Sequence, residues 1–96
     1  MLETIVCTFD ISNSFPEWVT KFDKEEAPAR EAKGIKIMFR GVAKDNPSKV
    51  VVIVQAEEGV LPKYIQENYE TFIANGALMY TAVAKAYSQS DQCTGD

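Results

Sequence analysis

The 96-residue sequence contains no histidine, and this absence excludes several kinds of active site. A serine or cysteine nucleophile activated by a histidine base cannot be built from this chain, and neither can a haem or metal centre with histidine ligands. The patterns G-x-x-x-x-G-K-S/T and G-x-G-x-x-G, whose backbone binds nucleotide phosphates, do not occur. We therefore predict neither a metal ion nor a cofactor, and no residue is predicted to be catalytic.

Basic residues are also few. Ten Lys and Arg stand against fourteen Asp and Glu, giving a net charge of -4, so the chain lacks the basic surface that binding to nucleic acid requires. No apolar run approaches the roughly 20 residues that cross a bilayer, and the N-terminal segment MLETIVCTFD lacks the basic start and apolar core of a signal peptide. We expect a cytoplasmic protein that binds neither nucleic acid nor a membrane, which leaves small molecules or other proteins as partners.

Cysteine occurs at only two positions. Cys7 lies in a predicted strand and Cys93 in a polar C-terminal segment, so we expect two separate thiols rather than a disulfide. Without histidine to complete a ligand set, these two residues do not predict a structural zinc site.

The most informative stretch that is present is KVVVIVQ, residues 49–55. Side chains alternate sides along a strand, so a strand with one face in water should alternate apolar and polar residues. Residues 50–54 are apolar at every position and mostly β-branched, which is typical of a central strand buried on both faces. One covering layer can come from the helices of this chain, and the other must come from elsewhere.

Three further segments, residues 4–11, 35–40 and 78–87, alternate apolar with mixed side chains and predict strands with one strongly apolar face. Residues 43–49 predict the turn of a hairpin that joins the second strand to the central one. The strongly apolar faces are formed by Ile5, Cys7, Phe9 and Ile11, by Ile35, Ile37 and Phe39, and by the small row Ala82, Ala84 and Ala86.

Two helical regions separate the strands. Ser14 with Glu17 three residues later is a capping box, and the helix that it starts has a stripe for burial at Phe15, Trp18, Val19 and Phe22. The polar residues 23–26 and Pro28 predict an interruption, after which residues 28–33 form an exposed segment. A second helix is predicted from Pro62 to Asn75, with a buried stripe of Leu61, Ile65, Asn68 or Tyr69, Phe72 and Ile73.

The element order predicts an α+β fold, a ferredoxin-like βαββαβ sandwich in which a four-stranded antiparallel sheet carries both helices on one face. The first and third strands are central in that topology, in agreement with the apolar run at residues 50–54. We expect residues 1–87 to form this single domain and residues 88–96 to be a disordered tail.

The other face of the predicted sheet lacks a covering layer. It is predicted to carry part of the apolar run and a mixture of side chains that is too apolar to remain in water as one patch. A second copy of the chain, presenting the same face by two-fold symmetry, would cover it, so we expect a homodimer. The residues predicted on this face, besides part of the run, are Thr8, Met38, Arg40, Thr81 and Val83.

In length and element order the chain resembles the dimeric α/β-barrel superfamily, in which two such sheets pack face to face. More narrowly, the segments FPEWVTKFD, GIKIMFRGVAKDNPSKVVVIVQAEEGV and NYETFIANG are similar to a small family of uncharacterised bacterial proteins seen largely in marine cyanobacteria. This resemblance implies the barrel architecture and brings no catalytic residue with it. Because some related barrels oxidise aromatic polyketides without a cofactor, it also implies a monooxygenase-like enzyme as an alternative function.

Candidate ligand-binding residues lie on both sides of the predicted sheet. Arg40, near Thr8 and Met38, can grip a carboxylate or phosphate in a fork geometry, and the alternative is a plain ion pair with Asp10 or with an acid of a partner. Aromatic residues can line a cleft for a flat organic ligand or simply pack the core, and the candidates are Trp18, Phe22, Tyr64, Tyr69 and Tyr80.

Three functions stay open at this point. The chain is either a homodimeric barrel that binds a small organic or anionic ligand, or a cofactor-independent monooxygenase, or a plain protein-interaction module. A closed apolar cavity of several hundred cubic ångströms with one or two convergent polar groups would favour the monooxygenase, and a filled interior would exclude it.

Overall fold

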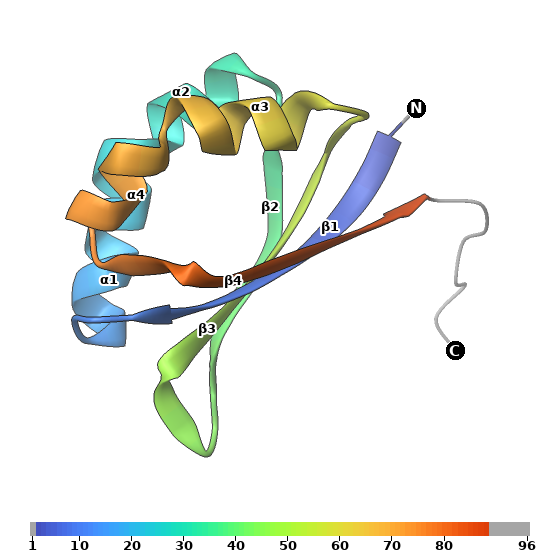
Figure 1. Ribbon diagram of the computed structural model, residues 1–96. Helices are drawn as coiled ribbons and strands as arrows, with labels where there is room; N and C mark the ends of the chain where they lie inside the picture. The colour runs from blue at the N-terminus through green and yellow to red at the C-terminus, as the bar shows by residue number, and fades with distance from the viewer. Residues whose placement is uncertain (1, 89–96) are drawn as a thin grey trace.

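The computed structural model describes residues 2–88 as a twisted antiparallel sheet with its helices gathered on one side (Figure 1). The strand order β2-β3-β1-β4, with every neighbouring pair antiparallel, is the order of the predicted ferredoxin-like fold, so the fold prediction is confirmed. In chain order the elements are β1 (Leu2–Ile11), α1 (Phe15–Lys21), the π-helix η1 (Phe22–Glu26), α2 (Ala27–Ala32), β2 (Lys36–Ala43), β3 (Asn46–Glu57), α3 (Val60–Glu67), α4 (Tyr69–Ala74) and β4 (Ala77–Ser88).

The predicted tail, residues 88–96, lies outside the described residues except for Ser88, which ends β4. None of the helices within residues 2–88 combines the length and the apolar character that spanning a bilayer requires.

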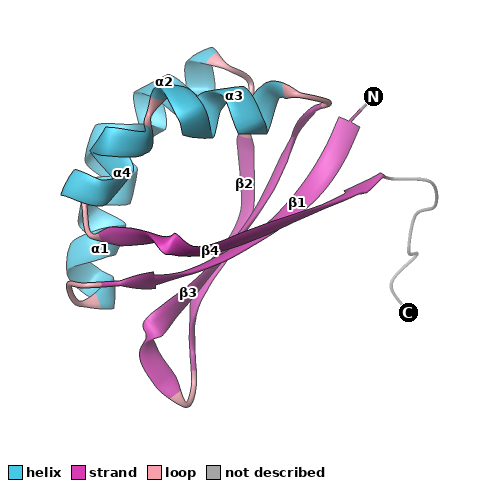
Figure 2. Cartoon of the chain, in the orientation of Figure 1, coloured by secondary structure: helices cyan, strands magenta, loops and turns pink. Residues whose placement is uncertain are grey.

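Strand β3 is central, as the apolar run predicts (Figure 2). Val50, Val52 and Val54 are at most 5% exposed and belong to the core beneath the helices. Val51 and Ile53 alternate with them and are only half-buried, on the side that no helix of this chain covers. We call this uncovered side of the sheet the open face.

Strand β2 departs from the predicted alternation at a β-bulge. Ile37 pairs with Val54, but the next paired residue is Phe39, which lies opposite Ile53, so Met38 is an extra residue in β2. Since side chains alternate along a strand, one inserted residue sends every later side chain to the opposite face. The prediction was therefore wrong for two residues: Phe39 lies on the open face, 54% exposed, and Arg40 lies on the helix side.

The hairpin turn is also shorter than predicted. Residues 43–49 were expected to form it, but β2 continues to Ala43 and β3 starts at Asn46, which leaves Lys44 and Asp45 as the turn. Pro47 lies within the start of β3, beyond the part of the strand that pairs with β1, where a missing backbone donor is tolerated.

The first helical region starts as predicted and is divided into two α-helices as predicted, but the residues between them form a π-helix rather than a break. The Ser14 hydroxyl caps α1 by accepting a hydrogen bond from the Glu17 backbone N–H (3.3 Å). Pro28 cannot donate to the carbonyl four residues earlier, and the chain passes this point through the wide π-helical turn η1 before α2 begins. The prediction that residues 28–33 are exposed is confirmed for Pro28, Glu31, Ala32 and Lys33. It is wrong for Arg30, which is 7% exposed and packs on Phe22.

The second helical region is two helices rather than the single helix predicted. Asn68 ends α3 by donating from its side chain to the Tyr64 backbone oxygen (2.9 Å), and α4 begins at the next residue. Tyr64 lies one helical turn after Leu61 and is 4% exposed, so α3 presents it to the interior of the domain. After the break the buried stripe does not continue as predicted, since Ile73 is 50% exposed.

Strand β4 forms one edge of the sheet and is exposed along residues 82–88. Its register with β1 shifts between Thr8 and Asp10, and after the shift Ala84 pairs with Cys7 and Ala86 with Ile5. These pairs put the small alanine row on the helix side, as predicted. Small side chains at this edge leave room between β4 and the helices.

Candidate functional site

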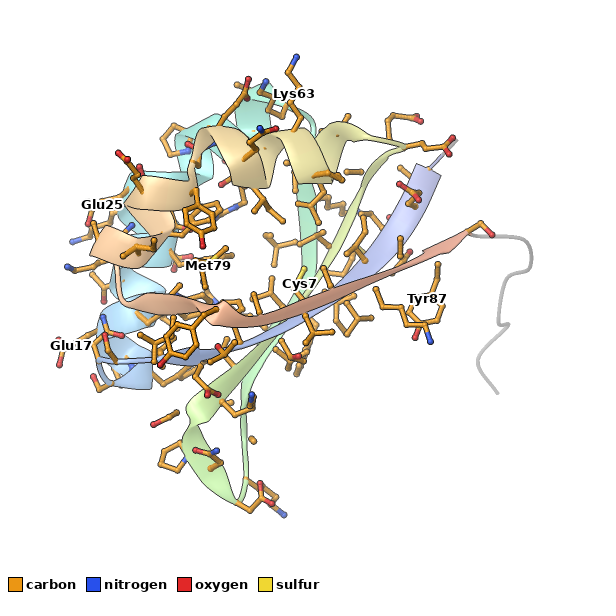
Figure 3. The ribbon with its side chains drawn as sticks, viewed as in Figure 1. Cys7, Glu17, Glu25, Lys63, Met79 and Tyr87 are labelled. Carbon is orange, nitrogen blue, oxygen red and sulfur yellow. The ribbon has the colours of Figure 1, made fainter. Side chains whose placement is uncertain are left out.

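A cavity of about 240 Å³ lies between the helices and the sheet. Cys7 from β1 and Met79 from β4, both labelled in Figure 3, form part of its floor, and Trp18, Phe22 and Tyr64 reach it from the helices. Ala82 and Ala84 line the cavity and are also exposed, so the cavity opens to solvent along β4. The remaining lining residues are Phe9, Glu26, Arg30, Ile35, Ile37, Val52, Val54, Leu61, Ile65, Phe72, Ala77 and Val83.

Aromatic rings give the helix side of the cavity a rigid apolar wall. Trp18 is 2% exposed, and its ring centroid lies 4.7 Å from that of Phe22 and 5.6 Å from that of Phe9. Tyr64 and Phe72 form a second pair with centroids 5.5 Å apart. Such offset and tilted ring pairs fix their side chains, so the cavity has a defined shape and flat surfaces.

Three polar side chains interrupt this apolar lining at one place. Glu26 comes from η1, Arg30 from α2 and Tyr64 from α3, and each is at most 7% exposed. The Arg30 guanidinium lies over the Phe22 ring, 3.8 Å from its centroid, and its Nη1 is 4.0 Å from Glu26 Oε1. We call Glu26, Arg30 and Tyr64 the polar corner of the cavity.

The polar corner has spare hydrogen-bonding capacity. Within the described residues, Arg30 Nη1 and the Tyr64 hydroxyl are buried and have no hydrogen-bond partner. Leaving a buried donor unpaired costs about 1–3 kcal/mol, more for a charged group. The two donors therefore favour an acceptor placed in the cavity.

The Glu26 side chain is held in place by a hydrogen bond from Asn75. Asn75, which follows α4 and is 3% exposed, donates from Nδ2 to Glu26 Oε2 (2.8 Å). Burial raises the pKa of the Glu26 carboxyl above its ordinary value of 4.5, while the bond from Asn75 and the charge of Arg30 oppose the rise and that of Glu25 adds to it. The carboxyl is thus an acid–base group in a cavity with apolar walls.

Replacing Glu26 by glutamine is expected to change how stability depends on pH. Because the folded-state pKa lies above 4.5, the folded protein binds this proton more tightly than the unfolded chain does. The contribution of Glu26 to stability is therefore greatest below pH 4.5 and falls as the pH rises through the raised pKa. Over that rise in pH, the free energy of unfolding of Glu26→Gln should increase relative to that of the wild type, in urea unfolding measured from pH 4 to pH 8.

The exposed neighbour Glu25 offers the matched control, since Glu25→Gln removes the same charge from the same turn. That variant should show no comparable gain at high pH. A clear loss of stability for Glu26→Gln at neutral pH would mean that the ion pair with Arg30 outweighs the burial of the carboxylate.

Three of the aromatic candidates predicted from the sequence, Trp18, Phe22 and Tyr64, line the cavity together, but the other candidates lie elsewhere. Trp18 lines the cavity, but Tyr80 is 84% exposed and is not part of the lining. Thr8 lies on the open face, opposite Val51, and Met38 is the bulge residue of β2, 47% exposed. Of these four, only Trp18 contributes to the cavity.

Arg40 is taken up by an ion pair. Its guanidinium donates from Nη1 and Nη2 to the two carboxylate oxygens of Asp23, the second at 3.1 Å, and this bidentate bond lowers the pKa of Asp23. The alternative predicted for Arg40 was an ion pair with Asp10 or with an acid of a partner, but Asp10 pairs with Lys49 (2.8 Å). Arg40 does not line the cavity, and the arginine that does so is Arg30.

Sequence reasoning missed Glu26, Arg30 and Asn75. One signal was available, since Phe22, Glu26 and Arg30 recur at every fourth position and so continue the buried stripe of the first helix. Charged side chains at such positions are ordinarily assigned to solvent, because burial of an unpaired charge is costly. Within residues 2–88, no group of three or more Cys, Asp or Glu side chains is arranged to hold a metal ion.

Comparisons with known proteins agree with this fold. Residues 2–89 match a family described as a domain of unknown function (DUF3764). No relative was found among curated proteins. Among solved structures, a NIPSNAP family protein with unknown function from Agrobacterium tumefaciens is similar with a TM-score of 0.65 and 10% identity, over 90% of this chain and 86% of that chain.

Two further solved structures are similar over nearly the whole chain. SnoaB, a cofactor-independent oxygenase from Streptomyces nogalater, has a TM-score of 0.66 and 11% identity, over 98% of both chains. An uncharacterized NIPSNAP-like domain protein from Burkholderia xenovorans has a TM-score of 0.59 and 12% identity, over 96% of this chain and 89% of that chain. At these identities the likenesses establish the fold alone.

Proposed function

We propose that this protein, which belongs to the DUF3764 family of domains of unknown function, binds a small organic molecule in the cavity between its helices and its sheet. The observation that carries the proposal is an apolar cavity of about 240 Å³ with buried, unpaired donors at one corner. Ligand sites combine apolar walls with a few convergent polar groups in this way.

The size of the cavity limits the size of its ligand. A closed cavity of about 150 Å³ holds benzene, so 240 Å³ corresponds to roughly ten non-hydrogen atoms. At about 0.5 kcal/mol per atom such a ligand binds with a Kd on the order of 0.2 mM. A natural ligand that also extends through the opening along β4 would bind more tightly.

A bulky side chain at the opening is expected to block binding. Ala84 lines the cavity from the exposed edge strand β4, where phenylalanine is well tolerated, so Ala84→Phe should fill space without unfolding the domain. Fluorescence of Trp18, the only tryptophan, should report the binding of tert-butylbenzene, and Ala84→Phe should weaken it at least tenfold.

Ala32→Phe gives the matched control, because Ala32 is exposed at the end of α2 and does not line the cavity. It should bind the probe as the wild type does. If the wild type fails to bind tert-butylbenzene, or if both phenylalanine variants bind it equally well, the cavity is not a ligand site.

The second candidate is a cofactor-independent monooxygenase, favoured by the cavity together with the similarity of the fold to SnoaB. In such a reaction the substrate supplies all four electrons that reduce O₂: a CH₂ group becomes a carbonyl, one oxygen atom of O₂ enters the product, and the other leaves as water with the two hydrogens of the CH₂ group. Glu26 is the group in the cavity that can accept the substrate proton. Oxygen uptake with a bound phenolic substrate, lost in Glu26→Gln, would support this candidate, and binding without oxygen uptake would exclude it.

We also propose that the protein is a homodimer joined through the open face. The register places Val6, Val51 and Ile53 in the middle of that face, with Phe39, Val83 and Tyr87 around them at 54%, 63% and 48% exposure. Figure 3 shows Tyr87 on the side of β4 away from the helices. An apolar patch of this kind is covered when a second copy presents the same face.

A further inference from the structure

The polar corner of the cavity contains two buried donors whose hydrogen-bonding capacity is not filled. Arg30 is 7% exposed and Tyr64 is 4% exposed, and neither Arg30 Nη1 nor the Tyr64 hydroxyl makes a hydrogen bond among the described residues. The nearest carboxylate oxygen, Glu26 Oε1, lies 4.0 Å from Arg30 Nη1, which is beyond hydrogen-bond distance. A guanidinium has only donors, and a phenol donates a single hydrogen. The group that satisfies both at once is an oxygen acceptor on the ligand.

The packing around Arg30 determines from which direction that acceptor can approach. Phe22 covers one face of the guanidinium at 3.8 Å, so hydrogen bonds must form in its plane. The backbone of Arg30 is also fixed, because its carbonyl accepts from the N–H groups of Lys33 and Ile35, each at 3.0 Å. A rigid planar donor of this kind matches a planar carboxylate better than it matches a single hydroxyl.

The balance of charge at the corner favours an anion. Arg30 keeps its positive charge at any ordinary pH, and Glu26, its nearest acid, is 4.0 Å away and is held by Asn75 rather than by Arg30. Burial raises the pKa of Glu26, so its carboxylate takes up a proton more readily than an exposed one. A ligand anion bound to Arg30 would favour this uptake, which removes the negative charge of Glu26. The other titratable groups around the corner are Tyr64 from α3, Cys7 from β1, and the exposed Glu25 and Asp23 on η1. Asp23 is held by Arg40, whose guanidinium lies 5.7 Å from the centroid of the Phe22 ring.

We propose that the ligand is a small organic acid of about ten non-hydrogen atoms, whose carboxylate binds Arg30 and Tyr64 while its apolar body lies against Trp18, Phe22 and Phe72. This inference rests on the proposed function, since it specifies the chemistry of the ligand in the same cavity. Glu26 takes up a proton when the acid binds, so the affinity increases as the pH is lowered.

Isosteric probes separate this inference from cavity binding in general. The acid 3-phenylpropionate and the amide 3-phenylpropionamide have the same shape and the same number of non-hydrogen atoms, and they differ in charge. Titration calorimetry of the wild type at pH 6 should show the acid binding at least tenfold more tightly than the amide, since hydrogen bonds to charged groups are the stronger ones. In buffers of different ionisation enthalpy, binding of the acid should be accompanied by uptake of a fraction of one proton.

Variants of the polar corner should remove the preference for the acid and leave the affinity for the amide nearly unchanged. Arg30→Met keeps the length of the side chain but leaves the Glu26 carboxylate buried without its ion pair. If that variant unfolds, the double variant Arg30→Met/Glu26→Gln removes the unpaired charge and takes its place. Tyr64→Phe should reduce the preference about threefold to tenfold. Arg40→Met removes an equal charge outside the cavity and should retain the full preference of the wild type.

The possible results decide between the two proposals. If acid and amide bind equally well to the wild type, the inference about the organic acid is wrong and the cavity remains a ligand site. A preference that persists in Arg30→Met/Glu26→Gln would also overturn it, because the anion would then bind elsewhere. If neither probe binds and tert-butylbenzene does not bind either, the proposed function itself fails.

Discussion

Val52→Lys is expected to unfold the domain, whereas Ile53→Lys at the next position is expected to leave it folded and monomeric. Val52 is 5% exposed beneath the helices, and Ile53 lies on the open face. Holding a lysine neutral at pH 7, well below its ordinary pKa of about 10.4, costs roughly 5 kcal/mol. That is most of the stability of a domain of this size, which is typically about 5–10 kcal/mol.

Ile53→Lys faces a different penalty. The half-buried side chain can extend its ammonium into water in the monomer, so we expect a loss of about 1 kcal/mol or less in urea unfolding. In the proposed dimer the same ammonium would meet its symmetry mate across an apolar interface, and light scattering should then show a monomer at micromolar concentration.

Two controls sharpen the comparison. Val50 is fully buried and does not line the cavity, so a lysine there cannot extend into the cavity, and Val50→Lys should be at least as destabilising as Val52→Lys. Thr20→Lys, on the exposed side of α1, should change neither the free energy of unfolding nor the mass of the oligomer in light scattering. If Ile53→Lys remains a dimer while folded, the open face is not the dimer interface.

The difference between positions 52 and 53 illustrates how far the sequence alone leads. The apolar run at residues 50–54 predicts a central strand correctly, because only burial on both sides makes an unbroken β-branched run favourable. It cannot say which residues face the helices, since either register gives the same pattern. The pairing of Cys7 with Val52 decides this, and it depends on contacts between segments far apart in the chain.

Strand β2 shows a second limit. Its alternation is regular in the sequence, yet the bulge at Met38 reverses the face of Phe39 and Arg40. No residue type at this point marks the bulge, because Met38 is neither a glycine nor a proline. The predicted anion site at Arg40 was therefore assigned to the wrong side of the sheet, and its guanidinium is instead bound by Asp23.

The cavity was beyond prediction for a different reason. A cavity is a volume that side chains fail to fill, and composition or periodicity cannot show such a shortfall. The aromatic set did include Trp18, Phe22 and Tyr64, which line the cavity, but it also included Tyr69 and Tyr80, which are exposed. Tyr64 lies on the buried side of α3, one turn after Leu61, whereas Tyr69 follows the break at Asn68 and is 45% exposed; that break was missed.

Trp18→Ala is expected to lower the free energy of unfolding by about 3–5 kcal/mol, the range measured when a buried tryptophan or phenylalanine is truncated. Trp18 is 2% exposed, and its ring packs against Phe9, Phe15 and Phe22 with centroids 4.7–6.0 Å apart. Tyr80→Ala removes an aromatic ring that is 84% exposed and should change stability by less than about 0.5 kcal/mol in the same urea titration.

The same variant tests whether the core and the ligand site are one structure. Because Trp18 lines the cavity, its removal enlarges the space open to a ligand, and a bound apolar molecule should replace part of the lost packing. At a concentration tenfold above its Kd, tert-butylbenzene should add about 1.4 kcal/mol to the stability of whichever protein it binds. We expect Trp18→Ala to be stabilised at lower probe concentrations than the wild type. Equal or weaker stabilisation would mean that the site collapses without the indole, so that Trp18 shapes the cavity in addition to lining it.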